Sequence, residues 1–138
     1  MRIFLDANIL FSAAKSSGAI RTLVRMLADQ GHECWVDPFV IEEARRNLAA
    51  KFPEALADLQ ALIGTLQVGA IRAGTEAYAD TTWLPEKDRP VLQAAIALRC
   101  DVLVTGDQKH FGAGFGKRIG GVSIHSPRSL AEAILRRS

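Results

Sequence analysis

Short runs of apolar residues alternate along the chain with longer amphipathic stretches. The runs at residues 3–5, 34–36, 102–104 and 122–124 are bounded by polar residues or glycine, which is typical of short buried strands. Apolar positions spaced by three and four residues predict helices within residues 20–27, 40–48, 56–66, 91–96 and 130–134. Ser126 and Pro127 supply an N-cap and a first helical position for the last of these helices.

This alternation predicts the fold class. Strands separated by helices need crossover connections, and crossovers produce parallel strand pairs. We therefore expect an α/β domain with a central, mostly parallel sheet of four to five strands flanked by helices. Residues 68–72 are the candidate for the fifth strand, and the glycine-rich residues 112–121 are expected to form a loop.

Length and composition narrow the class of protein. The chain has 138 residues, of which 49% are hydrophobic, so residues 1–138 are expected to form one domain with a real core. Cys34 and Cys100 are isolated thiols beside apolar residues, which favours two buried cysteines in a reducing compartment. Neither a signal peptide nor an apolar run long enough to span a membrane is found, so we expect a cytoplasmic protein without a membrane partner.

The charge is distributed unevenly. The net charge is only +2, yet residues 1–107 carry 11 basic and 14 acidic side chains, whereas residues 108–138 carry 6 basic and 1 acidic. An acid-rich body followed by a basic segment is compatible with a carboxylate site beside a phosphate-binding surface, although a solvated basic tail explains it equally well.

Four acidic residues are candidates for one site. Asp6 and Asp107 follow the first and third apolar runs, and functional groups collect at the carboxyl ends of parallel strands. On a helix that buries Val40, Ala44 and Leu48, Glu43 lies on the flank of the buried stripe, whereas its neighbour Glu42 faces solvent. Asp88 precedes the helix near residues 91–96 and can point into the same edge.

Each acid also has a simpler explanation. Asp6 and Asp88 can be helix N-caps, Asp107 a turn residue, and Glu43 a surface charge. If the four do converge, their negative charges repel one another unless a cation neutralises them, and carboxylate oxygens favour Mg²⁺ or Mn²⁺. Zn²⁺ is not favoured, because the three histidines lie far apart in the sequence (His32, His110 and His125). Such a site would hydrolyse phosphodiester bonds.

Four motifs in this order resemble the PIN-domain family of metal-dependent nucleases. They are residues 4–10 (FLDANIL), 40–48 (VIEEARRNL), 88–95 (DRPVLQAA) and 103–111 (LVTGDQKHF). The resemblance implies a three-layer α/β/α fold with Asp6, Glu43, Asp88 and Asp107 as metal ligands and catalytic acids. It also implies that Asn8 and Thr105 support those acids, and that the chain is a ribonuclease, in many small members a toxin held inactive by an antitoxin.

The basic segment then acquires a candidate role. Lys109, Lys117 and Arg118 lie around the glycine-rich residues and are expected to hold RNA phosphates. Phe111 and Phe115 are expected to pack under the loop rather than to stack on bases.

Other functions fit the residues less well. A phosphatase of the haloacid-dehalogenase type would need acids at positions 8 and 111, where Asn8 and Phe111 stand, and a receiver domain would need a pair of acids at the first strand end. A catalytically silent RNA-binding or partner-binding module remains the alternative. The amphipathic residues 56–66 could also support a homodimer.

Overall fold

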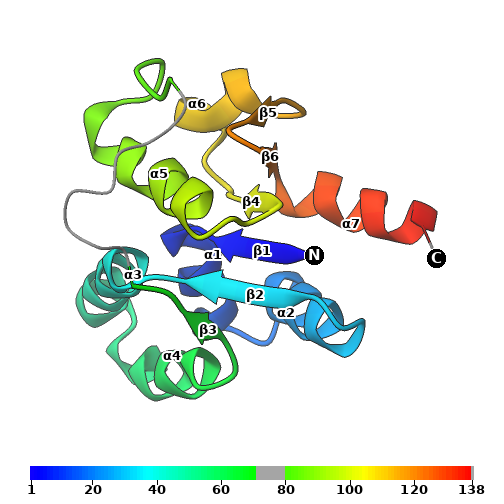
Figure 1. Cartoon of the computed structure of the whole chain (residues 1–138). Coiled ribbons are helices and arrows are strands. Elements are labelled where there is room, and N and C mark those ends of the chain that lie inside the picture. The colour runs from blue at the N-terminus through cyan, green and yellow to red at the C-terminus, as the bar shows by residue number, and fades with distance from the viewer. Residues whose placement is uncertain (71–79, 138) are drawn as a thin grey trace.

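A mostly parallel sheet forms the centre of the computed structural model, which describes residues 1–70 and 80–137 and side chains up to residue 134 (Figure 1). Within these residues the sheet has six strands in the order β3-β2-β1-β4-β6-β5. Their bounds are β1 Arg2–Leu5, β2 Glu33–Val36, β3 Gln67–Val68, β4 Val102–Val104, β5 Arg118–Ile119 and β6 Val122–His125. All neighbouring strands are parallel except β5 and β6, so the predicted sheet is confirmed with one strand more than expected.

Helices flank the sheet in an α/β/α arrangement (Figure 1). They are α1 Ala7–Lys15, α2 Ala19–Asp29, α3 Pro38–Lys51, α4 Leu56–Ile63, α5 Arg89–Ala97, α6 Gln108–Phe111 and α7 Pro127–Arg137. Single 3₁₀ turns occupy Pro53–Ala55, Glu86–Asp88 and Gly112–Gly114. The predicted start of the last helix is confirmed, because the Ser126 hydroxyl accepts a hydrogen bond from the Ser129 backbone N–H at 3.1 Å.

Two parts of the sequence prediction need correction. Helices α1 and α6 were not predicted, and the glycine-rich residues 112–121 are more ordered than a loop because they contain a 3₁₀ turn and β5. Of the candidate strand at residues 68–72, Val68 belongs to β3, while residues 71 and 72 lie outside the described part. Within residues 112–121, Gly114 has a packing role, because a Cβ at this position would come within 2.6 Å of the Trp83 side chain.

The two central strands are buried on both faces. Phe4, Leu5 and Leu103 are completely inaccessible to solvent, as expected for central strands of a parallel sheet covered by helices. The predicted burial of both cysteines and of Phe111 is also confirmed, and Phe115 is partly buried against the core. None of the helices in the described part is both long and apolar enough to cross a membrane.

The strand register determines where the polar residues emerge. Leu5 lies opposite Val104, and Val104 lies opposite His125, so β1, β4 and β6 end at the same level. The loops that follow β1 and β4 are therefore neighbours, and the next residues in each, Asp6 and Thr105, meet at the carboxyl edge of the sheet.

Shortening a side chain at the centre of the sheet should destabilise the fold. Leu103→Ala leaves a cavity between the sheet and its helices, and we expect a loss of about 3 kcal/mol in the free energy of unfolding, measured by chemical denaturation. Val68→Ala, at an exposed position of edge strand β3, is the control and should change this free energy by less than about 0.5 kcal/mol. Equal losses in the two variants would contradict this account of the core.

Candidate active site

Asp6 is a buried carboxylate at the end of β1. Its side chain accepts hydrogen bonds from the Ala7 backbone N–H at 2.7 Å, the Asn8 amide at 3.2 Å and the Thr105 hydroxyl at 2.7 Å. It caps α1, so the N-cap explanation holds for this residue. Burial nevertheless raises the pKa of Asp6 to about 6, because the hydrogen bonds only partly offset the cost of desolvating the charged form.

Asn8 and Thr105 join the loop after β1 to the loop after β4. The Asn8 amide donates to the Thr105 hydroxyl at 3.2 Å, and its oxygen accepts from the Gly106 backbone N–H at 2.8 Å. The Thr105 hydroxyl in turn accepts from the Asp107 backbone N–H at 3.1 Å. Through this network Asn8 and Thr105 connect Asp6 to the loop that carries Asp107.

Asp88 and Asp107 meet at His110. The imidazole Nδ1 of His110 lies 3.0 Å from Asp88 Oδ2 and 2.8 Å from Asp107 Oδ2. Asp107 caps α6 through the His110 backbone N–H, but Asp88 makes no capping hydrogen bond to α5, so the N-cap explanation does not hold for Asp88. Desolvation, reinforced by the charge of Asp107 and opposed by His110, raises the pKa of Asp88.

The two adjacent glutamates of α3 point in different directions. Glu42 is exposed and forms an ion pair with Arg45, whose guanidinium Nε lies 2.9 Å from Glu42 Oε2. This ion pair holds the pKa of Glu42 below its usual range. Glu43 is half-buried, and its charge contributes to the raised pKa of Asp6.

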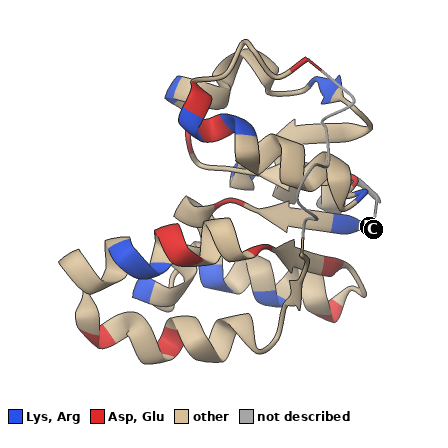
Figure 2. Cartoon of the chain, turned by 60° about the vertical axis from the view of Figure 1, so that its left-hand side comes forward, with Lys and Arg blue, Asp and Glu red and all other residues tan. Residues whose placement is uncertain are grey.

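All four predicted acids line one pocket of about 280 Å³ at the carboxyl edge of the sheet. They come from four separate parts of the chain, and the described lining also includes Phe11, Asn47, Lys51 and Lys87. Around this side of the molecule Lys and Arg are interspersed with Asp and Glu on the helices (Figure 2). The pocket lining therefore combines four acids with two lysines.

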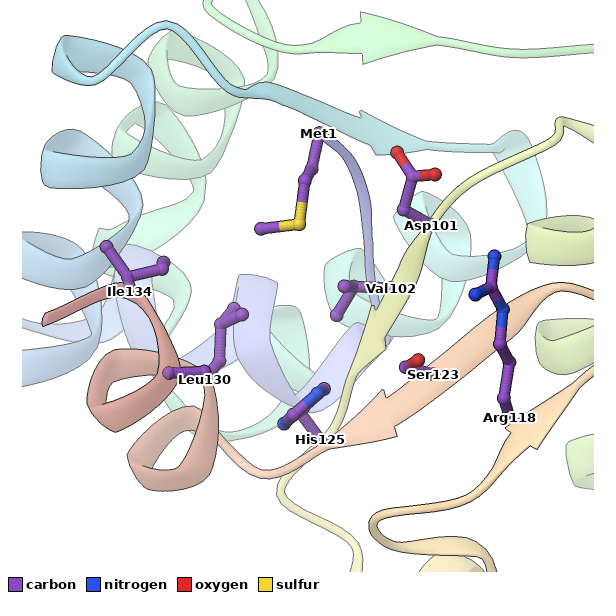
Figure 3. Close-up of a pocket in the computed structure, with 9 residues that line it drawn as sticks. Met1, Asp101, Val102, Arg118, Ser123, His125, Leu130 and Ile134 are labelled. Carbon is purple, nitrogen blue, oxygen red and sulfur yellow. The ribbon is translucent and has the colours of Figure 1, made fainter. Parts of the chain in front are cut away.

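The predicted phosphate-binding residues are not part of the pocket lining. Arg118 pairs with Ser123, which lies opposite the first residue of β4 and so away from the carboxyl edge. It lines a different pocket of about 310 Å³, next to Asp101 and helix α7 (Figure 3). Lys109 lies on α6 two residues after Asp107, and Lys117 immediately precedes β5.

Several residues in or beside the pocket are not predicted from the sequence. His110 does not line the pocket but contacts Asp88 and Asp107, and its position three residues after Asp107 brings both to one side of α6. Asn47 and Lys51 follow Glu43 at intervals of four residues, a spacing that places them along one face of α3. That spacing was the signal that could have identified them.

The donor atoms could hold a divalent cation. Oxygens of Asp88 and Asp107 and a nitrogen of His110 all lie within 4.8 Å of one another. Asp88 Oδ2 and His110 Nδ1 are buried and lie 3.0 Å apart without a well-aligned hydrogen bond, so a bound ion would satisfy both atoms. Carboxylates joined by one imidazole suit Mn²⁺ in particular and also Mg²⁺.

Comparisons with known proteins give the fold and the family. Among solved structures, the chain resembles VapBC2 from Rickettsia felis bound to a DNA fragment from its promoter (TM-score 0.67, 16% identity, 91% of this chain and 98% of that chain). It also resembles VapBC-1 from nontypeable Haemophilus influenzae (TM-score 0.61, 13% identity, 93% of this chain and 99% of that chain). A third similar structure is the Sarcin-Ricin loop cleaving toxin VapC20 from Mycobacterium tuberculosis (TM-score 0.58, 13% identity, 85% of this chain and 98% of that chain).

A comparison with curated proteins gave no match. The family model of the PIN domain, however, matches residues 2–109, which contain β1, all four pocket acids and the loop after β4. The matched residues thus include every acid that the structure gathers at the carboxyl edge of the sheet, and the chain belongs to the PIN domain family.

Proposed function

We propose that the chain is a metal-dependent endoribonuclease that hydrolyses RNA phosphodiester bonds, with residues 1–138 as one nuclease domain. One observation carries the proposal: Asp6, Glu43, Asp88 and Asp107, from four separate segments, line a single pocket. Burial raises the pKa values of Asp6 and Asp88, and the neighbouring carboxylates raise them further, so the charged forms are unfavourable in a site without a cation.

The four acids would hold Mn²⁺ or Mg²⁺, with His110 close enough to contribute a nitrogen. When bound, the ion supplies an activated water and neutralises charge on the phosphate. The residues of the chain do the rest: Thr105 and Asn8 keep the Asp6 carboxylate oriented, and Lys51 and Lys87 bring positive charge to the pocket wall. Of the basic residues predicted from the sequence, Lys109 is best placed to approach a phosphate there.

A protein inhibitor is a proposed partner. Two of the solved structures that resemble this chain are of VapBC proteins, and another is described as a Sarcin-Ricin loop cleaving toxin. We propose by analogy that this chain is the toxin of a toxin–antitoxin pair and that its antitoxin restrains the same pocket.

Removing either of two central acids should abolish cleavage. Asp6→Asn and Asp107→Asn keep the size of the side chain but remove the negative charge. We expect each to lower Mn²⁺-dependent cleavage of single-stranded RNA by more than about 100-fold, because even residues that support metal ligands contribute about 10- to 100-fold. Gel assays with and without EDTA measure this. RNA binding by the wild type without any cleavage would instead favour the catalytically silent module.

The adjacent glutamates give a matched pair of variants. Glu43→Gln changes an acid of the pocket, whereas Glu42→Gln changes an acid paired with Arg45 at the surface. We expect Glu43→Gln to reduce cleavage at least about tenfold and Glu42→Gln to leave it within about twofold of the wild type. The same assay decides between them, and the reverse order of effects would remove Glu43 from the proposed site.

The raised pKa of Asp6 should make the metal-free protein less stable as the pH rises. Asp6 binds its proton more tightly when folded (pKa about 6) than in an unfolded chain (about 3.9), so stability falls between about pH 4 and pH 6 and stays lower above that range. The contribution is about 3 kcal/mol. Asp6→Asn should lack this fall, and added Mn²⁺ should raise the melting temperature of the wild type alone at pH 7.5. Parallel pH profiles for the two proteins would contradict the assignment.

A further inference from the structure

Two aromatic rings and two lysines form a continuous surface beside the pocket. Phe11 of α1 contacts Phe52, which follows the last residue of α3, with ring centroids 5.9 Å apart and planes inclined at 63°. Lys15 Nζ lies 5.7 Å from the Phe11 centroid and 5.5 Å from that of Phe52, and Lys51 Nζ lies 5.9 Å from that of Phe11. We call Phe11, Lys15, Lys51 and Phe52 the aromatic–lysine patch.

The patch is open to solvent. Phe52 keeps 36% of its surface exposed, and both lysines are exposed. Within the described part of the chain neither lysine forms an ion pair with a carboxylate; their ammonium groups lie over ring faces instead. Both the ring of Phe52 and the two positive charges are thus available to a ligand.

The patch is also continuous with the proposed catalytic acids. Phe11 and Lys51 line the same pocket as Asp6 and Glu43. Along α3 the lining changes from Glu43 through Asn47 to Lys51, that is, from negative through neutral to positive over about two helical turns. A chain of phosphates that places one phosphate among the acids, with a metal ion, would bring its neighbours to the lysines.

We propose that the aromatic–lysine patch binds single-stranded RNA next to the bond that is cleaved. The proposal rests on the ribonuclease function above and deepens it by naming the strand's path and its unpaired state. Phe52 stacks on a base, and Lys15 and Lys51 neutralise the adjoining phosphates. A base that stacks on a side chain must be free of its own helix, which is why a single strand fits and a duplex does not.

This path differs from the one predicted from the sequence. Arg118 lines the pocket beside Asp101 and α7, whereas Lys51 lines the pocket that holds the acids. A strand bound at the acids therefore meets the lysines of α1 and α3 before it meets Arg118.

The stacking step is tested by fluorescence anisotropy with an eight-nucleotide RNA in Mn²⁺, in an Asp107→Asn background that keeps the RNA intact. We expect Phe52→Leu to weaken binding about tenfold, while Phe52→Tyr, which retains an aromatic face, binds as the parent does. A series of RNAs, each lacking the base at one position, then locates the stacked base. For the RNA that lacks this base, we expect Phe52→Leu and its parent to bind with the same affinity. Thermal melting of each variant confirms that it is folded.

The lysines are tested by the salt dependence of binding. Lys15→Gln and Lys51→Gln should each reduce the slope of log K against log salt by about 0.7, the value for one phosphate contact on a single strand. Arg25→Gln removes a positive charge from an exposed position of α2 and should leave the slope unchanged.

Unchanged RNA binding in Phe52→Leu and in both lysine variants would overturn the proposal, as would equal loss in Arg25→Gln. If the patch variants bind RNA normally but no longer bind the antitoxin, the proposal is also overturned, and the patch is then a protein-binding surface. The ribonuclease function is judged separately, because it depends on Mn²⁺-dependent cleavage by the wild type. Cleavage with normal RNA binding in the patch variants refutes only the patch.

Discussion

The hydrogen bond from the Thr105 hydroxyl to Asp6 is the contact on which the candidate site depends. It forms only because β1 and β4 are neighbouring parallel strands that end together, with Leu5 opposite Val104. A shift of one residue in this register would turn Asp6 to the other face of the sheet. The apolar residues that fill the core therefore also determine the site, since they leave the two strands a single way to pair.

The same burial that orders Asp6 also makes its charge unfavourable. Three hydrogen bonds orient the carboxylate, yet its pKa stays raised, and the charges of Glu43 and Asp88 raise it further. If stability alone had shaped this edge, one capping acid would suffice for each helix, and Asp88 caps none. Without a cation, the converging acids lower the stability of the fold, whereas a cation bound among them would raise it.

Local patterns predicted those elements that bury one face or lie fully inside the sheet. Apolar runs identified β1, β2, β4 and β6, and the loops after β1 and β4 followed from them. Helix α1 is not among the predicted helices, although Ile9 and Ala13, and likewise Leu10 and Ala14, lie four residues apart on one buried face. Helix α6 and strand β5 have four and two residues, too few to show a period. The approach of His110 to Asp88 depends on tertiary packing and has no local signal.

Charge along the chain proved a poor guide to charge in space. The basic residues after Asp107 are numerous, yet Arg118 lies back from the carboxyl edge, whereas Lys51 and Lys87 reach the pocket from the acid-rich part of the sequence. The reason is geometric: a helix that carries one acid to the edge of the sheet carries the residues four and eight positions later along the same wall. On α3 those positions hold Asn47 and Lys51, so the helix that contributes Glu43 to the acids also contributes positive charge to the substrate path.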